Sequence, residues 1–141
     1  MASQLGDSVG PYLSLLGRVL IAAIFILSGV SKIGGYAATQ AYMHSAGVPG
    51  ALLPLVIFTE LGGGIAIVAG AYTRIVALLL AGFCILTGLL FHAGSPDQTQ
   101  QIMFMKNLGL AGGFLFLVAG GPGRLSVDRF LRKGDSTPGG S

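Results

Sequence analysis

Four long apolar runs constrain what this chain can fold into. A helix needs about 20 mostly apolar residues to cross the hydrocarbon core of a bilayer, and the residues at 12–31, 51–71, 75–91 and 102–120 meet that requirement. Hydrophobic residues make up 52 % of the 141 residues and charged residues only 9 %, whereas a soluble domain carries about 25 % charged residues. The sequence therefore predicts an integral all-α membrane protein, an antiparallel bundle of four transmembrane helices.

The fourth run reaches this length only if it encloses a lysine. A helix that begins after Asn107 would contain only about a dozen apolar residues, which is too few to cross a bilayer. A helix that begins near Ile102 has the required length and contains Lys106 and Asn107. We therefore expect both polar residues to lie inside the membrane helix, near one end of it.

The remaining chain divides into short segments. Residues 1–11 form an N-terminal cytoplasmic segment that carries Asp7 and no basic residue, so the run at 12–31 is interpreted as a retained helix and not as a signal peptide. Residues 34–47 are typical of a short amphipathic helix. Residues 122–133 mix apolar with basic side chains and predict a juxtamembrane amphipathic helix on anionic lipid. Residues 134–141 are expected to be a flexible tail.

The basic residues predict the orientation in the membrane. The C-terminal segment carries Arg124, Arg129, Arg132 and Lys133, and the loop between the second and third runs carries Arg74. The other two loops hold far fewer basic residues. By the positive-inside rule, both termini and the Arg74 loop are cytoplasmic. The pI of 9.4 mostly reflects these residues, so the predicted partner is the lipid bilayer and no nucleic acid.

Ionisable residues inside the predicted spans are the main functional signal. A charge at the centre of a bilayer costs about 2.5–3.5 kcal/mol on insertion scales, so such groups usually face the bundle interior and form pairs. Glu60 lies near the middle of the second span, and the axial offset to Arg18 is about 8 Å at 1.5 Å per residue. A structural ion pair between Arg18 and Glu60 is therefore predicted.

A second polar group lies toward the outer ends of the spans. Lys32, Lys106 and Asn107 are the predicted ligand-binding residues, and Glu60 and His92 are the predicted proton-handling residues. Positive charges outnumber Glu60 in this interior, and a quinone headgroup, a phenolate or a small oxyanion would accept hydrogen bonds from these donors. The alternative interpretation is structural: a locked ion pair, with lysines that extend to the lipid headgroups.

The sequence also resembles a known family. The motifs LGRVLIAAIFILSGVSK, FTELGGGIAIVAGAYTR, FH, QQIMFMKNLGLAGGFL and GPGRLSVD, spread over residues 16–128, together are similar to the DoxX family of four-helix bacterial membrane proteins. The family's polar positions match Arg18, Lys32, Glu60, Lys106 and Asn107, and its frequent histidine matches His92. The resemblance implies a multi-pass protein of the bacterial inner membrane. It also implies a link to quinone chemistry, because the family takes its name from a subunit of a thiosulfate:quinone oxidoreductase.

The sequence leaves two functions open, and it does not decide whether the chain is an enzyme. The first is a small subunit of a quinone-linked membrane redox complex, with a quinone or a small anionic ligand in an outward-facing polar pocket. The sequence contains no CxxCH haem motif, no dinucleotide-binding GxGxxG in a βαβ context and a single cysteine, Cys84. We therefore expect no covalently bound cofactor, no metal site, and electrons from a redox partner subunit. The second is a non-enzymatic scaffold or assembly factor, acting with other subunits or as a homo-oligomer, whose buried charges only lock the bundle.

Overall fold

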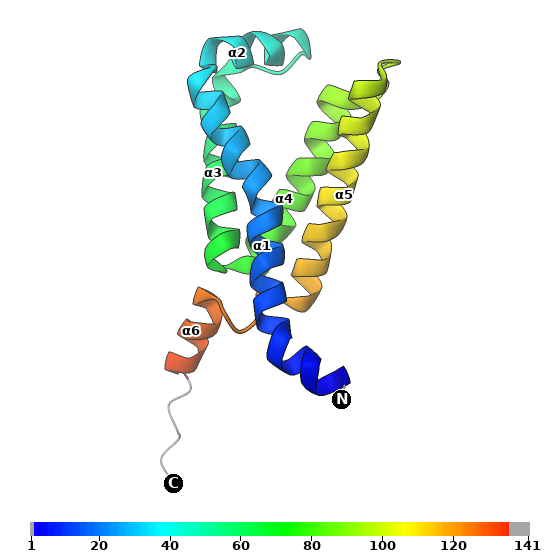
Figure 1. The fold of residues 1–141 in the computed structure, drawn as a ribbon. Helices are drawn as coiled ribbons and strands as arrows, with labels where there is room; N and C mark the ends of the chain where they lie inside the picture. The colour runs from blue at the N-terminus through cyan, green and yellow to red at the C-terminus, as the bar shows by residue number, and fades with distance from the viewer. Residues whose placement is uncertain (1, 136–141) are drawn as a thin grey trace.

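The computed structural model describes residues 2–135, and the regular structure in this part of the chain is helical. Four helices in the described part of the chain are long and apolar enough to cross a membrane. They are α1 (Ala2–Gly34), α3 (Leu53–Ala69), α4 (Thr73–Thr87) with its π-helical extension η2 (Gly88–His92), and α5 (Gln98–Gly120). Successive helices run in opposite directions (Figure 1). The predicted all-α architecture with four membrane-spanning helices is confirmed.

The four helices form two pairs. α1 packs along α3, and α4 packs along α5. The pairs approach each other toward the end where α6 (Val127–Asp135) lies, and they diverge toward the opposite end (Figure 1). There, α2 (Tyr36–Ser45) and the short 3-10 helix η1 (Gly50–Leu52) connect α1 to α3, and α2 crosses the end of this pair.

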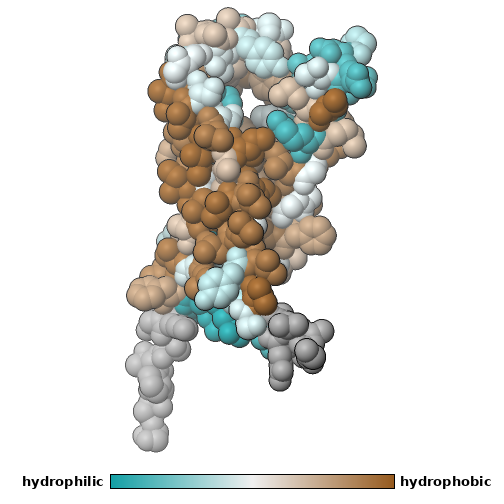
Figure 2. Space-filling view, viewed as in Figure 1, coloured by the Kyte–Doolittle hydropathy of each residue, from teal (hydrophilic) through white to brown (hydrophobic). Residues whose placement is uncertain are grey.

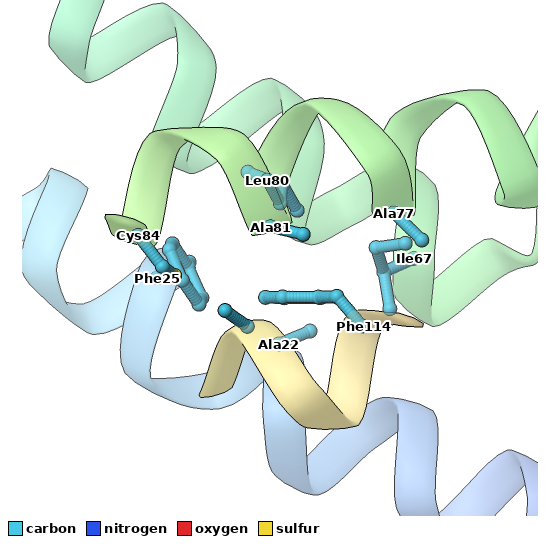
Figure 3. Close-up of a cluster of buried hydrophobic side chains, with 9 residues drawn as sticks. Ala22, Phe25, Ile67, Ala77, Leu80, Ala81, Cys84 and Phe114 are labelled. Atoms are coloured by element: carbon cyan, nitrogen blue, oxygen red, sulfur yellow. The ribbon is translucent and has the colours of Figure 1, made fainter. Parts of the chain in front are cut away.

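The buried core lies where the two pairs meet (Figure 3). The rings of Phe25 and Phe114 pack edge to face with their centroids 5.4 Å apart, joining α1 to α5. Small side chains surround them, which allows the helix backbones to approach closely in lipid. The cluster consists of Ala22, Phe25, Ile67, Ala77, Leu80, Ala81, Cys84, Ala111 and Phe114.

The exterior of the bundle is apolar over most of its length. Figure 2 shows a broad hydrophobic band around the membrane helices, with hydrophilic residues gathered at its two ends. Large apolar side chains such as Leu20, Leu79 and Phe116 are 65 %, 65 % and 82 % exposed, as expected for surfaces that contact lipid. The beginning of α1 and the helix α6 lie at the same end of the bundle (Figure 1). The cytoplasmic assignment of that end stays a prediction.

Two of the segment boundaries differ from the predicted ones at the ends of the chain. α1 already begins at Ala2, so residues 2–11 continue the first helix through Pro11. α6 begins at Val127 and not at residue 122, because Gly121 and Gly123 have φ values of +75° and +83°, which no helix accommodates. Of the predicted flexible tail, residues 134 and 135 belong to α6, and the rest lies outside the described residues.

Candidate functional site

Glu60 forms an ion pair, but with a different partner from the one predicted. The Nζ atom of Lys32, in the last turn of α1, lies 2.8 and 3.1 Å from the two carboxylate oxygens of Glu60 in α3. The same ammonium donates to the hydroxyl of Ser28 one turn earlier, at 2.6 Å. The Glu60 side chain is 6 % exposed and that of Lys32 is 25 % exposed. Two of the predicted site residues therefore form one charge-paired unit.

Arg18 does not pair with Glu60, so the predicted Arg18–Glu60 ion pair is wrong. Arg18 donates to the carbonyl oxygens of Ile67 at 3.1 Å and Val68 at 2.9 Å, and also to that of Leu125. The last carbonyls of a helix lie at the negative end of the helix dipole and can accept further hydrogen bonds, so they attract a buried guanidinium. Ile67 is seven residues after Glu60, about 10 Å further along α3. Arg18 thus joins three segments at the α6 end.

A cavity of about 790 Å³ lies between the two helix pairs, beneath α2. Figure 2 shows a hollow in the surface between α2 and the upper ends of α4 and α5. The walls are mostly apolar and include Ile24, Phe25, Leu52, Leu55, Val56, Phe83, Leu86, Leu90, Met103 and Leu110. The polar side chains that line it are Ser28, Ser31, Lys32, Thr39, Thr59, Glu60, Thr87, His92, Gln100, Lys106 and Asn107. The structure thus gathers all five residues predicted to bind ligand or handle protons around one cavity.

His92 ends the π-helical turn and lines this cavity. The amide of Ala93 donates to the carbonyl of Gly88 at 2.9 Å, which closes the wide turn, and such turns occur frequently at functional sites. The His92 Nδ1 atom lies 2.5 Å from the side-chain oxygen of Gln100 in α5. This hydrogen bond fixes the imidazole and leaves its Nε2 atom for a ligand or a proton.

Asn107 is 8 % exposed and is held by α4. Its side-chain amide donates to the carbonyl of Cys84 and to the hydroxyl of Thr87, both at 3.2 Å. Gly88 allows this approach, because a Cβ added there would lie 3.4 Å from the Cβ of Asn107 and 3.3 Å from the Phe104 ring. The amide donors are thus used within the protein, which leaves the carboxamide oxygen of Asn107 for a ligand.

Lys106 also lines the cavity, and unlike Lys32 it has no acidic partner among the described side chains. Its side chain is exposed, and no hydrogen bond or salt bridge joins it to the described residues, whose side chains span 7–132. The charges of Lys32 and Glu60 compensate each other. The cavity therefore carries one uncompensated positive charge, in a surrounding where charge is costly unless it is paired.

The roof of the cavity contains residues that the sequence did not single out as functional. The ring of Tyr42 in α2 stacks on Phe91 in η2, with centroids 5.4 Å apart and an interplanar angle of 19°. Met43 is 3 % exposed and also lines the cavity. Ser28 could have been found, because it lies four residues before Lys32 on the same helix face. The Tyr42–Phe91 contact has no such signal, since it depends on how α2 crosses the bundle.

The part of the chain that the structure describes contains no group of three or more His, Cys, Asp or Glu side chains placed to hold a metal ion.

Comparisons with known proteins place the chain among bacterial membrane proteins. The DoxX family model matches residues 13–93. The inner membrane protein YqjF of Escherichia coli (strain K12) is 52 % identical over 119 residues, which cover 84 % of this chain and 92 % of that protein. The inner membrane protein YphA of the same strain is 36 % identical over 126 residues, covering 84 % and 90 %. A protein of Bacillus subtilis (strain 168) named "Putative oxidoreductase CatD" is 37 % identical over 68 residues, covering 48 % and 51 %. No solved structure matches the chain.

Proposed function

Because this chain belongs to the DoxX family and is an integral protein of the bacterial inner membrane, we propose that it is a small subunit of a quinone-linked redox complex and binds a quinone in the cavity between its helix pairs. The observation that carries this proposal is the Lys106 ammonium, which has no partner among the described side chains and lines a mostly apolar cavity. The name of the Bacillus subtilis relative, which covers about half of this chain, supports redox chemistry.

The cavity fits the group in size and chemistry. Pockets for small molecules typically measure about 300–1,000 Å³, with apolar walls and few polar groups, and this cavity measures about 790 Å³. Lys106 would donate a hydrogen bond to a quinone oxygen, His92 would do so through Nε2 in its protonated form, and the apolar side chains would contact the ring and its tail. A bound quinone supplies two-electron, two-proton chemistry. Glu60 and His92 are the side chains that would hold a proton beside it, and a partner subunit would supply or accept the electrons.

The test is the quinone content of the purified protein. The protein is extracted in a mild detergent from membranes that contain quinone, and the quinone per chain is measured by mass spectrometry. Loss of a hydrogen bond from a charged donor costs about 1.5 kcal/mol or more, so Lys106→Gln is expected to retain about tenfold less quinone. Arg129→Gln, which removes a cation at the other end of the bundle, is the matched control and should retain the wild-type content. Equal contents in wild type and Lys106→Gln would overturn the proposal.

A scaffold function is the second candidate, and one feature of α5 favours it. A Cβ added at Gly109 or Gly112 would meet nothing within 4 Å, so this face of the helix has room for a closely packed partner helix. Under this hypothesis, Gly109→Leu would abolish co-purification of a specific membrane protein, and Lys106→Gln would not. The quinone content of Gly109→Leu separates the two functions, because the first proposal expects it to be unchanged.

A further inference from the structure

A second cavity, of about 510 Å³, lies at the opposite end of the bundle from the quinone site. It is bounded by the beginning of α4, by the turn that follows α5 and by α6. Four arginines line it: Arg74, Arg124, Arg129 and Arg132. We call it the arginine cavity. Half of the protein's eight lysine and arginine residues thus surround one hollow.

The arginine cavity is built by backbone contacts that fix its walls. The Asp128 carboxylate in α6 accepts hydrogen bonds from the backbone N–H of Tyr72 at 2.7 Å and of Thr73 at 2.8 Å, at the start of α4. The backbone N–H of Asp128 in turn donates to the carbonyl of Gly70 at 2.9 Å. A Cβ added at Gly121 would lie 3.0 Å from the nearest guanidinium nitrogen of Arg74. The short turn therefore fits closely against Arg74.

Among the residues whose side chains the structure describes, the charges in this cavity are not balanced. Asp128 is the one acidic residue among the described residues that line it, and its two oxygens already accept the two backbone N–H groups. Among the side chains described by the structure, none of the four arginines forms a salt bridge. Four guanidinium groups therefore face one carboxylate, and planar guanidinium groups are suited to binding phosphate oxygens in pairs.

Apolar side chains adjoin the cationic ones. Ile75, in the first turn of the membrane helix α4, is 63 % exposed, and Leu131 of α6 is 57 % exposed. Both line the arginine cavity, together with Tyr72, which is 72 % exposed. Tyrosine is enriched where membranes meet water. A ligand in this position would therefore place its anionic part among the arginines and its apolar part along the surface of α4.

We propose that the arginine cavity binds the phosphate headgroup of one anionic phospholipid, with the acyl chains running along α4. Basic pockets at the ends of membrane helices recognise such headgroups, and each basic residue near the surface contributes about 1 kcal/mol, which is about fivefold in affinity. The site is independent of the quinone cavity, so either proposal can fail without the other.

The test measures lipid binding to the purified full-length protein in neutral detergent. Native mass spectrometry with added phosphatidylglycerol is expected to show one lipid bound per chain far more tightly than any further lipid. Phosphatidylcholine, which carries a phosphate but no net charge, is expected to bind at least tenfold more weakly. The double variant Arg129→Gln/Arg132→Gln is expected to lower the affinity for phosphatidylglycerol about 30-fold. Lys106→Gln, at the other end of the bundle, should leave it unchanged.

The charge-preserving double variant Arg129→Lys/Arg132→Lys separates a built site from a diffuse basic surface. A site that holds phosphate oxygens between guanidinium groups should lose several-fold in affinity with lysine, whereas a diffuse surface would keep it. Wild-type affinity in this lysine variant would therefore overturn the proposal. So would equal binding of phosphatidylcholine, or displacement of phosphatidylglycerol by inorganic phosphate at micromolar concentration, which would make free phosphate the ligand.

Discussion

The ammonium of Lys32 lies 2.8 and 3.1 Å from the two carboxylate oxygens of Glu60, and this ion pair joins α1 to α3 beside the cavity between the two helix pairs. Removing one partner of a buried pair costs about 3–5 kcal/mol, because it leaves an uncompensated charge. Lys32→Met is expected to fall near the lower end of this range, since the lysine is partly exposed. Thermal unfolding in detergent measures the loss.

A double-mutant cycle tests the same pair more sharply. The variant Lys32→Met/Glu60→Leu is expected to be less destabilised than the sum of the two single variants, since coupled partners are not additive. The control pair is Arg18→Met with Glu60→Leu, whose effects should add, because Arg18 bonds to backbone carbonyls near the end of α3 and not to the carboxylate. The structure would be contradicted if the stability effects of the Lys32 and Glu60 substitutions added and those of the Arg18 and Glu60 substitutions did not.

Some features of this structure follow from the composition of single segments, and others depend on how the helices are rotated and tilted against one another. The number of membrane helices follows from length and hydropathy, which are properties of the sequence alone, and that prediction is confirmed. The partner of Glu60 depends on the rotation and tilt of α1, which place Lys32 beside it and direct Arg18 to the carbonyl end of α3. Helical periodicity puts both basic residues on one face of α1 and cannot choose between them.

The candidate site was predictable in part for the same reason. The ionisable residues Lys32, Glu60, His92 and Lys106 are conspicuous in apolar runs, because each is costly to place in lipid, and all of them line one cavity. The role of Asn107 as a contact between α4 and α5 depends on the carbonyl of Cys84. Which backbone carbonyl a side chain reaches on a neighbouring helix leaves no trace in the sequence.

A matched pair of glycine substitutions tests the helix packing. At Gly64 in α3, an added Cβ would lie 2.7 Å from Cγ1 of Ile26 and 3.4 Å from the carbonyl oxygen of Ala22, both in α1. At Gly109 in α5 it would meet nothing within 4 Å. Gly64→Ala is therefore expected to cost about 1–3 kcal/mol through overpacking. Gly109→Ala should be neutral or stabilising by up to about 1 kcal/mol, since alanine favours the helix. Equal melting temperatures for the two variants would contradict this packing.

The stability of the protein in acid should depend on Asp128. Partial burial alone raises the pKa of this carboxyl, but the N–H groups of Thr73 and Tyr72 and the nearby Arg132 outweigh it, so the pKa is lowered overall. A carboxyl with a lowered pKa stabilises the fold above its ordinary value of about 3.9, and this contribution is lost as the pH falls through the lowered pKa. At neutral pH, Asp128→Asn is expected to cost about 1 kcal/mol, because the carboxamide has one acceptor oxygen for the two backbone N–H groups and carries no charge.

Melting temperatures from pH 7 down to pH 3 check this expectation. The difference between wild type and Asp128→Asn should be constant near neutral pH and should shrink below about pH 4, where the carboxyl of the unfolded chain takes up a proton before that of the folded protein does. If the difference in melting temperature between wild type and Asp128→Asn stayed constant down to pH 3, the charge of the carboxylate would not hold α6 to α4.

Asn107 provides the last test. If its side chain holds α5 to α4, substitutions at Asn107 and Thr87 should have coupled effects on stability, whereas a purely ligand-binding role predicts no such coupling. The side-chain amide of Asn107 donates to the Thr87 hydroxyl and to the Cys84 carbonyl, so Asn107→Leu is expected to cost about 1–3 kcal/mol in protein that holds no quinone. Thr87→Val removes one of the two acceptors, and the double variant should therefore be less destabilised than the sum of the single variants. Thermal unfolding of delipidated protein measures this coupling. If Asn107→Leu lost quinone while keeping wild-type stability, the amide would serve the ligand and not the contact between α4 and α5.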